Sequence, residues 1–100
     1  MRNFHFPGRS EVYSSNAMVA SSQPLASETA ISILKQGGNA MDMIEAGARI
    51  VEADATGLSV GIGGLPDRDG HVTLDACCMD HTGNAGSVCF VQGVLHPLSL

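Results

Sequence analysis

Tryptophan is absent from the 100-residue chain, and tyrosine and phenylalanine together make up only 4% of it. The core must therefore consist of aliphatic side chains, alanine and glycine. Basic residues are also few, because five Lys and Arg stand against ten Asp and Glu and leave a net charge of −5. Nucleic acids and anionic membranes both require a basic surface on the protein that binds them. The composition therefore argues against nucleic acid and against a membrane as partners.

An export signal is also not expected. Residues 1–11 contain Arg2 and Arg9 but no apolar run, so we expect an extended arm there and not a signal peptide. Cysteine is scarce, and the three that occur make an odd number, which argues against a disulfide scaffold. We therefore expect a reducing environment and a cytoplasmic protein.

What remains is the composition of a folded protein, with 44% hydrophobic and 15% charged residues. One hundred residues allow one small domain. The predicted elements amount to about half of a layered α/β domain. We therefore expect a single incomplete domain over residues 1–100.

A first helix is predicted from Pro24 to Gln36, where apolar residues recur at helical spacing. The Ser21-Ser22 pair offers caps for its first turn, in which proline is tolerated. The Gly37-Gly38 pair is expected to end it, because glycine enters the left-handed conformation freely.

A second helix is predicted to begin at Asn39. Asp42 stands three residues further on, where its carboxylate can complete a capping box with Asn39. The predicted buried stripe of this helix is Met43, Ile44, Gly47, Ile50 and Val51.

Strands are predicted on both sides of the helix pair. Alternation between His71 and Asp80 places Leu74, Ala76 and Cys78 on one face. The predicted strands are Val12-Tyr13, Ala17–Ala20, Leu58–Leu65, His71–Asp80 and Ser87–Val91. The resulting order is β-α-α-β-β-β, and a further helix begins at about His96.

A hairpin turn is predicted between the two strands that follow the second helix. Residues 66–70 have the composition of such a turn, with Gly70 at its positive-φ position.

The glycine-rich run from Ser59 to Gly64 invites comparison with a nucleotide-binding loop. A dinucleotide fingerprint requires G-x-G-x-x-G followed directly by a helix, and a turn follows here. No nucleotide cofactor is therefore predicted. Several glycines within one strand suggest instead that another segment approaches the backbone closely.

A group of potential metal ligands lies between His71 and His81. The adjacent Cys77 and Cys78 would point to opposite faces of a strand, so they cannot share one ion. His71 could activate Cys77 as a nucleophile, but about 20 Å of strand separates them at about 3.3 Å per residue. Neither a metal site nor a cysteine nucleophile is predicted.

The first part of the chain, from about Phe6 to Asp42, resembles the start of a γ-glutamyltranspeptidase. Three strings carry this resemblance. They are Phe6-Pro7-Gly8-Arg9-Ser10, Met18-Val19-Ala20-Ser21-Ser22-Gln23-Pro24-Leu25-Ala26 and Ile33-Leu34-Lys35-Gln36-Gly37-Gly38-Asn39-Ala40-Met41-Asp42.

From about Gly37 to Leu100 the chain resembles the α-subunit of a glycosylasparaginase, and the motifs are denser. They are Val51-Glu52-Ala53-Asp54, Ser59-Val60-Gly61-Ile62-Gly63-Gly64-Leu65-Pro66-Asp67, Thr73-Leu74-Asp75-Ala76, Met79-Asp80, Ala85-Gly86-Ser87-Val88 and His96-Pro97-Leu98-Ser99. Within the single domain we thus distinguish three parts: the arm 1–11, a transpeptidase-like strand and helix over 12–42, and a glycosylasparaginase-like helix, hairpin and strand over 43–100.

Both families belong to the N-terminal-nucleophile hydrolases. The resemblance therefore implies an α/β fold of the αββα sandwich type, of which this chain supplies the N-terminal half. Members of both families cleave themselves and use the newly exposed threonine as nucleophile, with its own α-amine as base. The threonines of this chain do not stand in that motif; they are Thr29, Thr56, Thr73 and Thr82. No catalytic residue is therefore assigned to this chain.

The glycosylasparaginase resemblance implies that Ser59 supports the geometry of the nucleophile. It also implies that Gly61, Gly63 and Gly64 let backbone approach the active threonine. Without the resemblance, Ser59 is a hydroxyl at the start of a strand that bonds to backbone. The Trp-Pro-Phe motif of glycosylasparaginases is missing, and Met18-Val19-Ala20 occupies that strand.

Three functions are compatible with these observations. The first is an α-subunit-like fragment of an asparaginase-type amidohydrolase, inactive alone, whose partner is a β-subunit-like half that carries the threonine. Its substrate would be a small amide or a glycosylated asparagine, and no cofactor or metal is implied. The second is a γ-glutamyltransferase or hydrolase fragment. The third is a truncated or synthetic hybrid with no enzymatic function.

Overall fold

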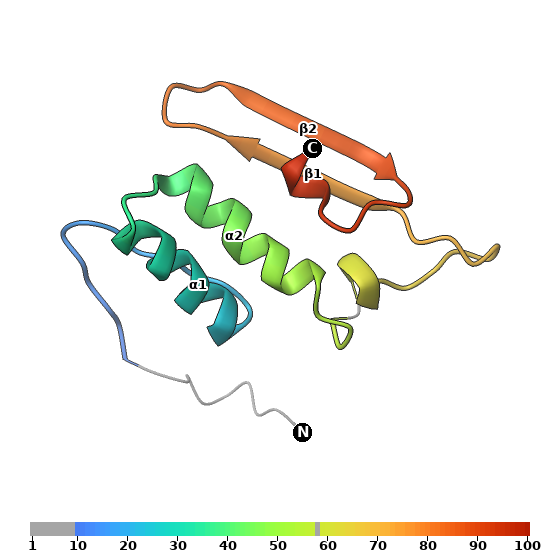
Figure 1. The fold of residues 1–100 in the computed structure, drawn as a ribbon, viewed down its shortest axis with the longest axis horizontal. Helices are drawn as coiled ribbons and strands as arrows, with labels where there is room; N and C mark the ends of the chain where they lie inside the picture. Colours follow the sequence, from blue (N-terminus) through green and yellow to red (C-terminus); the bar gives the residue numbers. More distant parts are fainter. Residues whose placement is uncertain (1–9, 58) are drawn as a thin grey trace.

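The computed structural model describes residues 10–57 and 59–100. Most of the predicted arm and Leu58, the first residue of a predicted strand, lie outside the described residues. The elements in chain order are α1 (Pro24–Lys35), α2 (Ala40–Glu52), the 3-10 turn η1 (Gly61–Gly63), β1 (Leu74–Met79), β2 (Ala85–Val91) and the 3-10 turn η2 (Pro97–Ser99). The two helices pack side by side, the two strands form a hairpin, and η2 lies between α2 and the hairpin (Figure 1).

The first predicted helix is confirmed as α1, but its predicted cap is wrong. The N-cap position falls on Gln23, whose side chain makes no capping bond. Pro24 explains this difference, because proline at the first helical position forces the residue before it into an extended conformation. Ser21 instead donates its hydroxyl to the carbonyl oxygen of Gln23 at 2.6 Å.

The predicted end of α1 and the predicted start of α2 are both confirmed. Gly37 adopts φ 94°, and its amide donates to the Leu34 carbonyl at 3.0 Å, as expected for a left-handed helix end. The amide of Asp42 donates to the Asn39 side chain at 3.0 Å, and the Asn39 amide donates to the Asp42 carboxylate at 2.8 Å. These two bonds form the predicted capping box.

The core is small, and it lies mainly between the helices. The buried apolar side chains are Ala26, Ala30, Met43 and Leu74. Gly47 permits the close packing of α2 on α1, because a Cβ atom there would lie 3.3 Å from the Ala26 carbonyl oxygen. The predicted burial of Ile44 is wrong, since this residue is 48% exposed.

The last two predicted strands are confirmed with shifted ends, as β1 and β2. They pair antiparallel, with Leu74 opposite Val91 and Cys77 opposite Ser87. The predicted alternation along β1 is also confirmed: Leu74 is buried, Ala76 and Cys78 are half-buried, and the residues between them are exposed.

Three predicted strands do not form. Residues 12–13 and 17–20 are not strands, and no strand among the described residues lies alongside to pair with them. Residues 61–63 form η1, and Gly61 there has φ 59°, far from the extended values of a regular strand. The order over residues 10–57 and 59–100 is therefore α-α-β-β, where β-α-α-β-β-β was predicted.

The turn predicted at residues 66–70 is present, although it does not join two strands. Gly70 has the expected positive φ of 85°, and its amide donates to the Asp67 carbonyl at 3.1 Å. The hairpin of the molecule instead turns between β1 and β2, where the Asp80 amide donates to the Asn84 carbonyl at 2.9 Å. Within the described part of the chain, no helix has the length and apolar character that crossing a membrane requires.

Candidate functional site

The glycine-rich run predicted to support a reacting group folds closely against the end of α2. A methyl group at Gly61 would lie 1.7 Å from the carbonyl oxygen of Glu52, and one at Gly63 would lie 1.9 Å from that of Gly57. At Gly64 it would lie 2.8 Å from Cγ1 of Val72. The close approach predicted from the glycines is therefore confirmed, and the approaching segments are the chain's own backbone and Val72.

Ser59 is the first residue of this run and is exposed. The described residues thus place one solvent-facing hydroxyl next to a tightly seated backbone turn. The supporting role that the resemblance implies for Ser59, Gly61, Gly63 and Gly64 stays a prediction.

Asp54 organises the turn on which the glycine run rests. Its carboxylate accepts bonds from the Thr56 hydroxyl at 2.7 Å, from the Thr56 amide at 2.9 Å and from the Gln23 side-chain amide at 2.7 Å. These bonds, above all the one from the Thr56 hydroxyl, hold the pKa of Asp54 below its ordinary value. The Gln23 bond also ties the start of α1 to this turn. Nothing in the sequence pattern indicated this link, which joins residues 31 positions apart.

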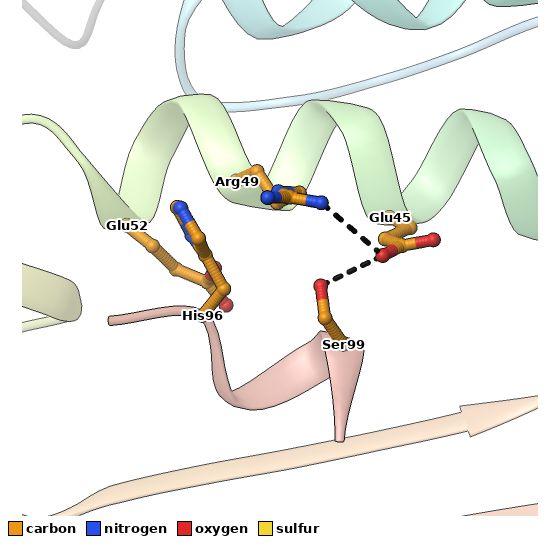
Figure 2. Close-up of polar contacts among 5 residues, drawn as sticks. All are labelled: Glu45, Arg49, Glu52, His96 and Ser99. Atoms are coloured by element: carbon orange, nitrogen blue, oxygen red, sulfur yellow. Dashed lines mark hydrogen bonds and ion pairs between the residues drawn. The ribbon is translucent and has the colours of Figure 1, made fainter. Parts of the chain in front are cut away.

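A second polar link holds η2 to α2. Glu52 is buried, with 6% of its surface exposed, and its Oε2 lies 2.9 Å from Nδ1 of His96. A carboxylate only accepts hydrogen bonds, so the imidazole Nδ1–H donates. About two turns of helix away, the Ser99 hydroxyl donates to Glu45 at 2.7 Å, and Arg49 lies 3.6 Å from the same carboxylate oxygen (Figure 2). No sequence pattern predicted either link.

The potential metal ligands between His71 and His81 do not gather. His71 lies in the exposed turn, where its Nδ1 is 3.9 Å from the Asp67 carboxylate. Cys77 is exposed and Cys78 is half-buried, and both are free thiols, as is Cys89. Across residues 10–57 and 59–100, no three His, Cys, Asp or Glu side chains are grouped so that they could hold a metal ion.

Three of the four threonine hydroxyls are used in local bonds. Thr29 donates to the Leu25 carbonyl at 2.8 Å, Thr56 donates to Asp54, and Thr82 donates to Asp80 at 2.6 Å. The bond from the Thr82 hydroxyl is the main reason why the pKa of Asp80 lies below its ordinary value. These threonines therefore act in helix and turn structure.

Comparison with known proteins defines the class. The family model described as asparaginase matches residues 9–100, so the chain belongs to this family. The family implies the N-terminal-nucleophile hydrolase fold, and the small α/β structure is consistent with it.

Curated relatives carry two kinds of name. The chain is 53% identical over 68 residues to an N(4)-(β-N-acetylglucosaminyl)-L-asparaginase of Elizabethkingia miricola, which covers 68% of this chain and 20% of the relative. It is 46% identical over 57 residues to the Rattus norvegicus protein of that name, covering 57% of this chain and 16% of the relative. It is 32% identical over 95 residues to an isoaspartyl peptidase/L-asparaginase of Rattus norvegicus, covering 94% of this chain and 26% of the relative. The chain thus spans between about a sixth and a quarter of these relatives.

The predicted likeness to glycosylasparaginases is confirmed by these matches. The asparaginase model also runs through residues 12–42, the part for which a γ-glutamyltranspeptidase likeness was predicted. That second likeness stays a prediction.

Proposed function

We propose that the chain is the N-terminal, α-subunit-like part of an amidohydrolase of the N(4)-(β-N-acetylglucosaminyl)-L-asparaginase type. The observation that carries this proposal is the identity of 53% over 68 residues to a protein of that name. The substrate would be an asparagine whose side-chain nitrogen carries a sugar. In the assembled enzyme the chain would supply the outer helices and part of one sheet of an αββα sandwich.

The reaction requires a threonine from a second, β-subunit-like segment. Its hydroxyl oxygen attacks the side-chain amide carbon while its own α-amine takes the proton, and the C–N bond then breaks as the glycosylamine leaves with a proton. Water next attacks the acyl-threonine ester and releases aspartate. Ser59 would support the position of that threonine, and Gly61, Gly63 and Gly64 would allow the main chain of this segment to approach it closely. The chain alone carries no nucleophile in this scheme and is inactive.

Exposed apolar side chains on the hairpin support the proposal that a second chain or segment packs against it. Met79 on β1 is 64% exposed and Phe90 on β2 is 75% exposed. Two strands alone are marginally stable in water, and their unpaired edges are templates for further strands. A β-subunit-like half that adds strands to these edges and packs a further layer against the hairpin would cover both side chains.

A second candidate activity is cleavage of isoaspartyl peptides or of L-asparagine. It is favoured by the match to the isoaspartyl peptidase/L-asparaginase, which extends over 94% of this chain. The γ-glutamyl alternative rests on the likeness of residues 6–42.

A substrate panel tests these candidates. The chain is combined with a glycosylasparaginase β-subunit, and the mixture is assayed with a glycosylated asparagine, an isoaspartyl dipeptide, L-asparagine and a γ-glutamyl amide. The proposal expects the highest kcat/KM with the glycosylated asparagine and no turnover by the chain alone. Preference for the isoaspartyl dipeptide would favour the second candidate. Glutamate release alone would overturn the asparaginase assignment.

A further inference from the structure

Glu52 faces two segments at once. Its side chain is buried and accepts a hydrogen bond from His96, 44 residues further along the chain. Its main-chain carbonyl oxygen lies so close to Gly61 that a Cβ atom added to Gly61 would be only 1.7 Å from it. One residue at the end of α2 therefore contacts both the glycine run and His96, which lies between β2 and η2.

A buried carboxylate must be paired, because the free energy of desolvating an unpartnered charge is large. His96 is that partner at 2.9 Å, and its own side chain is 21% exposed. Removing either partner would leave the other one without its hydrogen bond in a confined place. The pair therefore constrains the end of α2 more firmly than a surface contact would.

The 3-10 turn η2, which follows His96, is held in place by packing on two sides. Pro97 is buried, and η2 packs against α2 and against β1. The bond from Ser99 to Glu45 fastens the same turn to α2 at a second point, as Figure 2 shows. That second bond is exposed, and Glu45 lies seven residues before Glu52 in α2, away from its end. Of these two bonds, the one between Glu52 and His96 is the one whose α2 residue also contacts the glycine run, through its main-chain carbonyl.

We propose that Glu52 and His96 are positioning residues for the run Ser59–Gly64. The pair fixes the last residue of α2 to η2, and so it fixes the position of the Glu52 carbonyl against which Gly61 packs. It thereby determines where η1 and Ser59 lie relative to the sheet. The part of this inference that concerns catalysis rests on the proposed function. The part that concerns the order of the glycine run does not.

Amide exchange tests the structural part directly in the 100-residue chain. The Gly64 amide donates to the Gly61 carbonyl at 3.1 Å and reports on η1. We expect Glu52→Ala and His96→Ala to raise the exchange rate of this amide at least tenfold. Glu52→Gln keeps an acceptor for the imidazole and should restore much of the protection. Ser99→Ala is the matched control that breaks only the second bond, and it should change the rate less than twofold.

The Ala30 amide, inside α1, serves as the internal reference. If Glu52→Ala raises the exchange of Ala30 and Gly64 equally, the pair is a general stabiliser and the proposal is overturned. An unchanged Gly64 rate in Glu52→Ala, no protection of Gly64 in the unmodified chain, or an equal effect of Ser99→Ala overturns it too.

Activity tests the catalytic part in the complex with a β-subunit. Misplacement of catalytic geometry by about 1 Å lowers rates by up to about a hundredfold. We expect Glu52→Ala to lower kcat between about ten- and a hundredfold with little change in KM, and Glu52→Gln to recover most of it. Normal kcat in Glu52→Ala would overturn this part. A complex without any activity would instead count against the proposed function, and the exchange of Gly64 would still decide the positioning.

Discussion

The main-chain amide of Phe90 donates to the carboxylate of Asp75 across the hairpin at 2.8 Å. This bond lies at an irregularity of the ladder, between the pair Leu74–Val91 and the pair Ala76–Val88. Between these two pairs β1 has one residue and β2 has two, so β2 forms a bulge there. Phe90 is also the one non-glycine residue with positive φ, 59°, among the described residues. The Asp75 side chain thus supplies the acceptor that the ladder cannot supply at this bulge.

Asp75→Ala is expected to destabilise the chain by about 1 kcal/mol, because the bulge amide loses its acceptor. Asp75→Asn keeps a side-chain oxygen in the same place and should retain most of the stability. Chemical unfolding of the three proteins measures this difference. Equal midpoints for Asp75→Ala and the unmodified chain would show that water replaces the carboxylate without loss.

Asn39→Ala is expected to destabilise the chain by about 1 kcal/mol, because the capping box satisfies free amides at the start of α2. Ser22→Ala is the matched comparison at the other helix, where no side chain caps the first turn. We expect Ser22→Ala to stay within about 0.5 kcal/mol of the unmodified chain. Thermal unfolding of both variants checks the contrast, and a larger loss at Ser22 would contradict the cap assignment.

Gly61→Ala is expected to displace η1 or prevent folding. The new methyl group would lie 1.7 Å from the Glu52 carbonyl oxygen, and φ of 59° disfavours any side chain. Overpacking and the left-handed conformation together predict a loss of about 3 kcal/mol. Gly86→Ala, with no atom within 4 Å of its new methyl group, should be tolerated. Circular dichroism and unfolding midpoints of the pair provide the measurement, and equal stability of the two variants would refute the close approach.

Stability is expected to fall in acid because the pKa values of Asp54 and Asp80 are lowered in the folded chain. Hydrogen bonds from the Thr56 and Thr82 hydroxyls are the largest causes. The unfolded chain binds protons at these two carboxylates more readily than the folded chain does. Their contribution to the free energy of unfolding is therefore fully present above the ordinary aspartate pKa of about 4, and it is lost as pH falls through the lowered pKa values. Thr56→Val and Thr82→Val should flatten this dependence. Unfolding midpoints measured between pH 7 and pH 2 would contradict the assignment if the variants kept the full acid slope.

Local signals explain what the sequence could predict of the fold. Helix α1 and the start of α2 follow from apolar spacing, from Gly37 and from the Asn39–Asp42 pair, all of which act within a few residues. Strand β1 follows from the alternation along residues 71–80, but its pairing with β2 as a hairpin was not predicted, because the predicted hairpin turn lay at residues 66–70. These elements were predicted because their causes lie inside each segment.

The glycine run shows why the rest could not be predicted. Val60 and Ile62 alternate with small residues, which favours a strand by pattern alone. The conformation of Gly61 is decided instead by the Glu52 carbonyl, which only the folded chain brings to it. The same holds for His96 and Glu52, because no local pattern joins residues 44 positions apart. The predicted Ser21-Ser22 cap was wrong for the opposite reason, because a local cause, Pro24 at the first helical position, moved the N-cap to Gln23.

The central claim, that this chain works as the N-terminal part of an asparaginase-type enzyme, is tested most directly by association. The purified chain is run on size-exclusion chromatography, with intact-mass analysis, alone and with a glycosylasparaginase β-subunit. Our account predicts a stable complex of the two chains that releases aspartate from a glycosylated asparagine. Aggregation of the chain alone, with no complex and no activity in the mixture, would contradict it.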